Sequence, residues 1–374
     1  MSRISIKTVD SRGDLLDFIR LSWKINANDP NWVPPLLMDR LKVLDKEKNP
    51  FFQHAEAQYF LALRDGKVVG RIAAIINEKH NEFHQDNIGF FGFLEGIEDR
   101  EVFRRLLDTA ADWLRERGKD RMLGPVNPST NDEIGILIDG FDTPPYFMMT
   151  HNYPYYPRIM DELGFSKAKD VLAYRITSDT IKISDKLLQV TEATRKKLNV
   201  NIRSVDMNNF AEELDRIRQV YNAAWEKNWG FVPMTPAEFD FIAEDFRKIL
   251  DPELVLLAEV EGKAIGFSLA LPNYNEVFAK IPSGRLFPFG WLTFLRHRKK
   301  ISTLRIITLG VIQKYQQAGI GGMFYLETFR RGVKNGYFTG EMSWILEDNE
   351  LMVRSARLLG GDPYKTYRIY EKEL

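Results

Sequence analysis

The sequence predicts an α/β chain of two tandem domains, each with a mixed, mostly antiparallel, twisted sheet flanked by helices. Three observations support this fold class: the length of the chain, a repeat within it, and the same order of elements in both copies. At 374 residues the chain exceeds one ordinary hydrophobic core. Domains of about 100–200 residues are typical, so two are expected.

The repeat is carried by two predicted hairpins and two predicted helix ends. The hairpins turn at Asp65-Gly66 and at Glu261-Gly262, between apolar runs. Gly accepts the positive φ that such tight turns need. The turns are 196 residues apart, and the same offset separates the helix ends at Leu163-Gly164 and Leu359-Gly360. Two coincidences at one offset indicate a duplicated domain.

The duplication sets the expected domain boundaries. We expect a first domain over residues 1–178, a connecting helix within 179–200 and a second domain over 201–374. Apolar residues recur every three or four positions over 99–118 in the first copy and 319–335 in the second. This spacing predicts one long amphipathic helix in each copy.

Composition excludes several classes of function. Lys+Arg and Asp+Glu number 52 each, so no net field draws nucleic acid, and no nucleic-acid partner is expected. The chain has no Cys, which excludes a thiol nucleophile, a zinc–thiolate site, an iron–sulfur cluster and disulfides. No signal-peptide pattern and no apolar run of about 18 residues is found, so we expect a cytoplasmic protein.

Two histidines have the spacing of metal ligands. His80 and His84 are four residues apart, as two ligands on one helix face would be. The residues between them do not match a zinc-protease pattern, and no third ligand is evident. We therefore expect a solvated loop here and no metal site in the protein.

A glycine-rich turn follows the strand predicted over 304–312. Residues 315–322 are Tyr-Gln-Gln-Ala-Gly-Ile-Gly-Gly, and a long predicted helix starts within them. The first N–H groups of a helix lack internal partners, and glycines let a pyrophosphate approach the backbone. The turn predicts an anion site; the alternative is a glycine-rich helix start used for close packing. Neither the nucleoside-triphosphate loop nor the dinucleotide fingerprint is present.

This turn resembles the acyl-CoA loop of the GCN5-related N-acetyltransferase (GNAT) superfamily. Residues 316–321 match the family's [Arg/Gln]-x-x-Gly-x-[Gly/Ala] pattern. The preceding Leu-Gly-Val at 309–311 fits the family as well, as do the strand predicted over 340–346 and the helix that Asn349 opens. The resemblance covers residues 201–374 well. It implies acyl-CoA or acetyl-CoA as co-substrate, without a metal.

The first copy resembles the same fold but departs at the loop. Its equivalent residues 96–101 are Gly-Ile-Glu-Asp-Arg-Glu, with three acids where the phosphates would lie. Carboxylates repel a pyrophosphate. We therefore expect only the second copy to bind CoA, while the degenerate first copy helps to build the acceptor pocket.

Motifs along most of the chain narrow the resemblance to a bacterial tandem-GNAT family of largely uncharacterised acyltransferases. Some of its members are implicated in the N-acylation of a sphingoid base during bacterial ceramide synthesis. The motifs lie at residues 49–52, 89–93, 124–127, 139–142, 341–344 and 365–370.

The resemblance also implies a set of CoA-binding residues. Backbone N–H groups near Leu309 and Val311 would bind the pantetheine arm and the acyl carbonyl. The Gln316 side chain would donate to a phosphate oxygen. Asn349 would contact CoA, although capping the helix over 349–359 is enough to explain it. The pyrophosphate would be bound by the backbone N–H groups of Gln317, Ala318, Gly319, Ile320, Gly321 and Gly322.

Acyl transfer to an amine also needs a base and an acid. In a strand over 340–346, Glu341 and Ser343 share one face, and Glu341 is the candidate base. The alternative for Glu341 is an exposed carboxylate at the strand end. The family often places an acidic Tyr in the helix after Asn349, but that helix has none here. Tyr364 is the nearest later candidate for the acid.

Residues 286–300 form a long connection in the second copy. Aromatic and apolar residues come first, then Arg-His-Arg-Lys-Lys, and the whole segment lacks acids. This order suits a membrane interface with anionic headgroups. The alternative is a helix that packs on the first domain with its basic end in water.

The sequence therefore predicts an acyl-CoA-dependent N-acyltransferase. The expected acceptor is a small-molecule or lipid-like amine, and the expected location is cytoplasmic or peripheral to the inner membrane face. Two alternatives stay open: a catalytically inactive CoA- or ligand-binding protein, and an aminoacyltransferase of the peptidoglycan-bridge type. Zero net charge and the intact CoA loop argue against the second.

Overall fold

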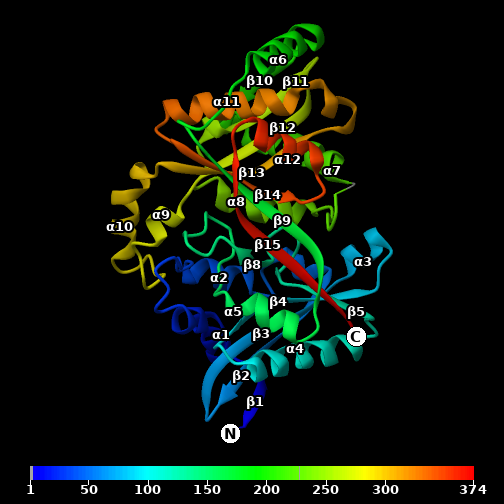
Figure 1. The fold of residues 1–374 in the computed structure, drawn as a ribbon, viewed down its shortest axis with the longest axis vertical. Coiled ribbons are helices and arrows are strands. Elements are labelled where there is room, and N and C mark those ends of the chain that lie inside the picture. Colours follow the sequence, from blue (N-terminus) through cyan, green and yellow to red (C-terminus); the bar gives the residue numbers. More distant parts are fainter. Residues whose placement is uncertain (1–2, 227) are drawn as a thin grey trace. The chain divides into compact units, whose positions relative to one another are not determined.

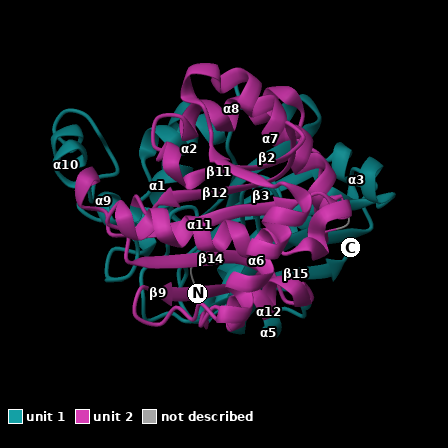
Figure 2. Cartoon of the chain, turned by 90° about the horizontal axis from the view of Figure 1, so that it is seen from above, with its two compact units in different colours: residues 1–171, 275–297, 365–374 teal, residues 172–274, 298–364 magenta. Residues whose placement is uncertain are grey.

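A computed structural model describes residues 3–226 and 228–374 and shows a mixed α/β fold (Figure 1). The chain forms two compact units (Figure 2). Unit 1 comprises residues 1–171, 275–297 and 365–374, and unit 2 comprises residues 172–274 and 298–364. Each unit holds a large twisted sheet with helices packed on it, and unit 1 also holds a separate two-stranded sheet.

Unit 1 has a mostly antiparallel sheet in the order β1–β2–β3–β4–β5–β15, with β8 also paired to β15. Among its described residues, β4 and β5 run parallel and the other neighbouring strands run antiparallel. The strands of this sheet are β1 (Ile4–Thr8), β2 (Ala55–Arg64), β3 (Lys67–Asn77), β4 (Ile88–Gly96), β5 (Arg121–Gly124), β8 (Ile136–Asp139) and most of β15 (Asp362–Glu373). The short strands β6 (Val126–Asn127) and β7 (Glu133–Ile134) pair with each other in a separate antiparallel sheet. The helices of unit 1 are α1 (Arg12–Ile25), α2 (Leu37–Val43), α3 (Glu78–His84), α4 (Arg100–Arg115), α5 (Tyr155–Glu162), α9 (Asn275–Phe278) and α10 (Gly290–His297).

Unit 2 has a sheet in the order β9–β14–β13–β12–β11–β10, in which β13 and β14 run parallel. Its strands are β10 (Asn201–Ser204), β11 (Val255–Val260), β12 (Lys263–Pro272), β13 (Thr303–Val311), β14 (Thr339–Leu346) and half of β9 (Ser166–Thr177). Its helices are α6 (Asp185–Leu198), α7 (Phe210–Trp225), α8 (Pro236–Phe246), α11 (Ile320–Lys334) and α12 (Glu350–Leu358).

The predicted hairpins and long helices are confirmed. Asp65 and Gly66 turn with φ of 50° and 76°, and Glu261 and Gly262 with 51° and 74°. Both residues of each turn thus adopt the positive φ of the tightest hairpins. The predicted helices over 99–118 and 319–335 are α4 and α11. The apolar stripe of α4 packs on the sheet of unit 1 through Phe103, Leu106, Leu107, Ala110 and Leu114.

The structure divides the chain differently from the boundaries expected at 1–178 and 201–374. Residues 275–297 belong to unit 1, where the Asn275 side chain donates to the Pro145 carbonyl and Trp23 donates to the Pro282 carbonyl. The helix expected to connect the domains is α6, and it belongs to unit 2. Sequence periodicity locates elements but carries no information about which core a connecting segment joins.

The last strands of the two copies are exchanged. Residues 370–373 of β15, from the second copy, pair with β5 in unit 1. The end of β9, from the first copy, lies beside β14 in unit 2, and the Ser178 N–H then donates to the Phe338 carbonyl. Each sheet is therefore completed by the other copy's final strand.

Candidate active site

The candidate site lies where β13 and β14 part. Their parallel ladder runs from Thr303–Thr339 to Ile306–Met342, over four residue pairs, although both strands continue to Val311 and Leu346. On its other side β13 pairs with β12, and the register shifts by one residue at Ile307. Such a bulge bends a strand and re-aims its side chains. The far half of β13 thus presents an edge outside the parallel ladder.

A polar cluster is buried at the end of this ladder. Glu341 is completely buried on β14, and Ser343 lies two residues further along the same face. The Ser343 hydroxyl donates to Glu341 Oε1 over 2.5 Å, and the Tyr364 hydroxyl donates to Glu341 Oε2. The carboxylate that the sequence singled out is therefore held from two sides, and it is not the exposed strand-end residue of the alternative.

Arg305 on β13 supplies the positive charge of the cluster. It faces Glu341 across the ladder, with Nε 3.6 Å from Glu341 Oε1, and it is almost completely buried. Its Nε–H also donates to Ser343 Oγ over 2.8 Å. A buried carboxylate is costly unless a cation and hydrogen bonds compensate it, and Arg305 and Ser343 do so here.

Tyr364 forms the outer end of the cluster. Its side chain is half-buried, whereas Glu341 beneath it has no exposed surface. The Arg175 guanidinium lies 5.3 Å from the centre of the Tyr364 ring. Tyr367, three residues further along β15, is completely buried and belongs to unit 1. The structure therefore brings together Glu341 and Tyr364 among the predicted catalytic residues.

The glycine-rich turn leads into α11 as the sequence predicts. Gly319 has φ of 84° and is the N-cap, and no side chain caps the first turn of α11. A β-carbon at Gly321 would meet only Leu309 Cδ2, at 3.8 Å. An uncapped helix N-terminus beside an open glycine fits a bound pyrophosphate, because free N–H groups and the helix dipole both favour an anion.

The other two glycines of the turn pack against α6. A β-carbon at Gly322 would lie 2.9 Å from Leu187 Cδ1, and one at Gly319 would lie 3.2 Å from Val190 Cγ1. Thr194 Oγ1 donates to the Ala318 carbonyl over 2.5 Å. Close helix packing, the alternative considered from the sequence, thus accounts for Gly319 and Gly322 but not for Gly321.

Two further predicted CoA contacts have partners within the protein. The Gln316 amide donates to the Val311 carbonyl over 3.1 Å, which ties the turn to the end of β13. Asn349 Oδ1 accepts the Met352 N–H over 3.2 Å, so Asn349 is the N-cap of α12 as expected. Leu309 and Val311 lie on the part of β13 beyond the parallel ladder.

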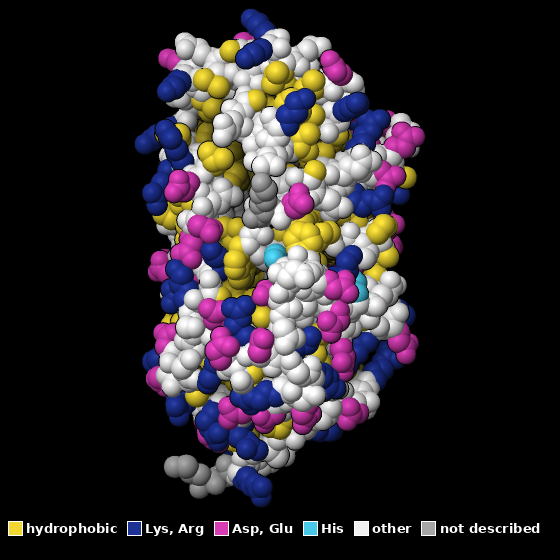
Figure 3. Space-filling view, turned by 90° about the vertical axis from the view of Figure 1, so that its right-hand side faces the viewer, with side chains coloured by type: hydrophobic (Ala, Val, Ile, Leu, Met, Phe, Trp, Pro, Cys, Tyr) yellow, Lys and Arg dark blue, Asp and Glu magenta, His cyan; other side chains and the backbone are white. Residues whose placement is uncertain are grey.

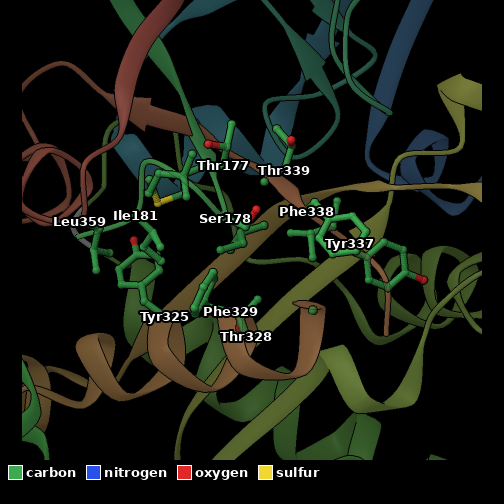
Figure 4. Close-up of a pocket in the computed structure, with 16 residues that line it drawn as sticks. Thr177, Ser178, Ile181, Tyr325, Thr328, Phe329, Tyr337, Phe338, Thr339 and Leu359 are labelled. Atoms are coloured by element: carbon green, nitrogen blue, oxygen red, sulfur yellow. The ribbon is translucent and has the colours of Figure 1, made fainter. Parts of the chain in front are cut away.

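An apolar pocket lies on the other face of β14. Leu304, Ile306, Tyr325, Phe329 and Met342 line it together with residues of the β9 end. Figure 4 shows Tyr325 and Phe329 among the lining side chains, on α11. Gly340 and Met342 alternate with Glu341 along the strand, so this pocket does not contain the polar cluster.

Sequence reasoning missed two features of the site. Arg305 was not singled out, although a charged residue between Leu304 and Ile306 in an apolar strand is a recognisable signal. Trp225 was also missed; a β-carbon at Gly310 would lie 2.1 Å from its ring, so this glycine lets α7 close over β13. No local pattern links Trp225 to a strand so distant in the sequence.

The histidine pair was predicted wrongly as a solvated loop. His80 and His84 lie on α3, their ring centres are 4.4 Å apart, and His80 is buried against Phe90. Burial, with His84 and Arg121 nearby, lowers the pKa of His80 to about 3. Within residues 3–226 and 228–374 no group of three potential ligands is placed to hold a metal ion, and no helix has the length and hydrophobicity needed to cross a bilayer.

Solved structures share this fold over nearly the whole chain. A tandem GNAT protein from the clavulanic acid biosynthesis pathway matches 99% of this chain and 98% of its own length, with a TM-score of 0.57 and 10% identity. A GCN5-related N-acetyltransferase from Sphaerobacter thermophilus matches 99% and 95%, with a TM-score of 0.54 and 14% identity. The fold is thus that of a tandem GNAT protein.

Comparison of the sequence with known proteins agrees with this fold and also identifies the family. A model of the acetyltransferase (GNAT) family matches residues 25–133, in the copy with the altered loop. A protein named bacterial ceramide synthase from Caulobacter vibrioides is 38% identical over 99% of this chain and 98% of its own. Protein YghO from Escherichia coli is 36% identical over 99% and 95%. The chain belongs to the bacterial tandem-GNAT acyltransferase family that contains these two relatives.

Proposed function

We propose that the protein is an acyl-CoA-dependent N-acyltransferase whose acceptor is a long-chain or amphiphilic amine. The observation that carries this proposal is the buried Glu341 carboxylate, covered by the Tyr364 hydroxyl at the point where β13 and β14 part. The name of the Caulobacter relative supports a sphingoid base as the acceptor and a fatty acyl group as the transferred unit.

In this proposal the open N-terminus of α11 at Gly321 binds the CoA pyrophosphate, and the free edge of β13 near Leu309 and Val311 binds the pantetheine arm. Bound acyl-CoA supplies the acyl group as an activated thioester. The three remaining tasks, which are removing a proton from the amine, holding it and returning one to sulfur, fall to the polar cluster.

The contacts of Tyr364 and Glu341 support one proton path for these tasks. Of the four residues in the cluster, Tyr364 alone has a partly exposed side chain, and its hydroxyl donates to Glu341. When Tyr364 Oη accepts the proton lost by the amine, its own proton moves to Glu341 Oε2. The reverse movement makes a proton available at Tyr364 Oη for the thiolate. Arg305 and Ser343 keep the carboxylate in place throughout.

The test measures thiol release from an acyl-CoA chain-length series with a panel of amines that includes a sphingoid base. We expect Glu341→Gln and Tyr364→Phe each to slow transfer at neutral pH by about 100-fold, because a positioned acid–base group contributes at least that much. Their affinity for CoA should match that of the unmodified protein.

Two results would contradict the proposal. Full activity of Glu341→Gln would remove this residue as the base. Saturable acyl-CoA binding by the unmodified protein, without thiol release for any amine, would favour an inactive binding protein.

A further inference from the structure

A cluster of apolar side chains is exposed in residues 285–300 of the chain. Phe287 and Phe289 are 73% and 74% exposed. Trp291, Leu292 and Leu295 of α10 are exposed as well. Within the helix these three residues span an arc of about 100°, so they form one apolar face. We call these five residues the aromatic tip.

The aromatic tip is held by ordered contacts on its inner side. Phe294 stacks on Phe278 of α9 with ring centres 6.4 Å apart. The Trp291 N–H donates to the Leu286 carbonyl over 2.7 Å, and its indole N–H donates to the Pro288 carbonyl over 2.9 Å. The helix thus packs through Phe294 and leaves its more apolar face outside, at the periphery of unit 1 (Figure 2).

Basic side chains surround the aromatic tip in the sequence. Residues 277–326 contain no Asp or Glu. Within the described part of the chain, none of the three cations Arg296, Lys299 and Lys300 forms an ion pair. The exposed cations of the segment, which we call the basic collar, are Arg285, Arg296, Arg298, Lys299 and Lys300.

The charge of this segment differs from that of the chain as a whole. The whole chain is neutral, and on the face shown in Figure 3 basic and acidic side chains are interspersed. Exposed Phe and Trp residues beside a cationic cluster complement one kind of surface, which is apolar beneath a negatively charged layer. A second copy of this chain fits less well, because a two-fold interface through the tip would bring the basic collars together.

We propose that residues 285–300 dock the protein on an anionic lipid bilayer. The aromatic tip enters the headgroup region, and the basic collar binds lipid phosphates. This inference concerns a surface outside the polar cluster and does not depend on acyl transfer. It would place the protein where an amphiphilic amine is dissolved.

The experiment is co-sedimentation of the full-length protein with phosphatidylcholine vesicles that do or do not contain phosphatidylglycerol, at low and at high salt. We expect binding that requires phosphatidylglycerol and weakens with salt. Replacing Arg298, Lys299 and Lys300 by Ser should lower the partition coefficient roughly 100-fold. Replacing Phe287 and Phe289 by Ser should lower it at least about tenfold.

Matched controls separate docking from general effects of substitution. Lys186, Lys196 and Lys197 are exposed on α6, and their triple Ser variant should bind vesicles as the unmodified protein does. Lys299→Arg with Lys300→Arg keeps the charge and should also bind normally. Circular dichroism and the melting temperature of each variant show whether it is folded.

Three outcomes would overturn the proposal. The first is no binding to phosphatidylglycerol vesicles at low salt. The second is equal binding by the folded Arg298/Lys299/Lys300 variant. The third is a dimer, detected by light scattering without vesicles, that Phe287→Ser with Phe289→Ser dissociates, which would make the tip a subunit interface.

Discussion

The two copies begin their long helices in opposite ways. In the first copy Asp99 caps α4: its carboxylate accepts the Glu101 N–H over 2.8 Å and also binds Arg64. In the second copy Gly319 opens α11, and no side chain caps it. The same fold thus satisfies one helix N-terminus with its own carboxylate and leaves the other available to an external anion.

The copies also differ where the parallel strands part. In the first copy the Asn127 side chain accepts the Phe93 N–H over 2.6 Å, and a β-carbon at Gly92 would lie 1.7 Å from the Val126 carbonyl oxygen. The first copy therefore fills the space beside β4 with its own backbone. In the second copy the β13–β14 ladder ends at Ile306–Met342.

The third residue pair of each parallel ladder, which we call the third rung, also differs between the copies. It pairs Phe90 with Leu123 in the first copy and Arg305 with Glu341 in the second, and all four side chains are buried. The third rung is therefore apolar in the first copy and an ion pair in the second. A fold tolerates either choice as long as each buried charge has its partner.

The largest effect is expected from closing the open helix terminus. Gly321→Glu should weaken CoA binding by about 1000-fold or more, because a carboxylate about 4 Å from a phosphate costs on the order of 4 kcal/mol near a protein surface. Calorimetric titration with CoA measures this change. The space around Gly321 predicts that the variant stays folded.

Gly321→Ala is the matched control, since its β-carbon meets only ordinary contacts, and it should retain CoA binding. If Gly321→Glu binds CoA with unchanged affinity, the phosphate site has been placed in the wrong part of the molecule. The contrast between the two helix termini would then be one of packing alone.

Replacing the Arg305–Glu341 pair by apolar residues like those of the first copy tests the difference at the third rung. Arg305→Phe alone should lower the free energy of unfolding by about 3–5 kcal/mol, because it leaves the Glu341 carboxylate buried without its cation. Arg305→Phe combined with Glu341→Leu copies the rung of the first unit and should recover much of that loss while abolishing transfer. Denaturant unfolding with an activity assay distinguishes the two variants. Equal destabilisation by both would mean that the ion pair is not the source of the cost.

Lowering the pH should destabilise unit 1 more than unit 2. All five histidines lie in unit 1, and burial lowers the pKa of both His80 and His151. In the unfolded chain His80 binds a proton as the pH falls below about 6.5, whereas in the folded protein it binds one only near pH 3. The unfolded state therefore binds more protons between these values, and the free energy of unfolding decreases as the pH falls below 6.5. At pH 4 the loss from His80 is on the order of 3 kcal/mol.

Hydrogen exchange followed by mass spectrometry at pH 7 and at low pH, corrected for the intrinsic exchange rate, locates this loss. Protection should decrease first in β3, α3 and β4 of unit 1, and His80→Gln should reduce the pH dependence. Uniform loss of protection in both units, unaffected by His80→Gln, would contradict the assignment.

Much of the fold was predictable because its signals are local. Acid–Gly turns, helical periodicity and a constant offset each depend on a few neighbouring residues, and they located the hairpins, α4, α6 and α11 correctly. The glycine-rich turn was also found before α11. Asn349 was expected to be a helix cap, and it is one.

The features of the fold and of the site that the sequence did not predict depend on contacts between residues far apart in the chain. Period-two alternation placed Glu341 and Ser343 on one face, but only the fold brings Arg305 and Tyr364 to them. Likewise, nothing in residues 319–322 indicates that α6 packs on two of the three glycines. His80, which was predicted to lie in a solvated loop, is buried against Phe90 of β4.

The exchange of final strands constrains how this chain can be divided. A fragment that stops at residue 178 would leave the outer edge of β5 without β15, and one that starts at residue 201 would leave β14 without β9. Bare strand edges of this kind promote aggregation. We therefore expect neither half to fold as an independent module when it is produced alone, and we expect a destabilising change in the first copy to weaken the second copy as well.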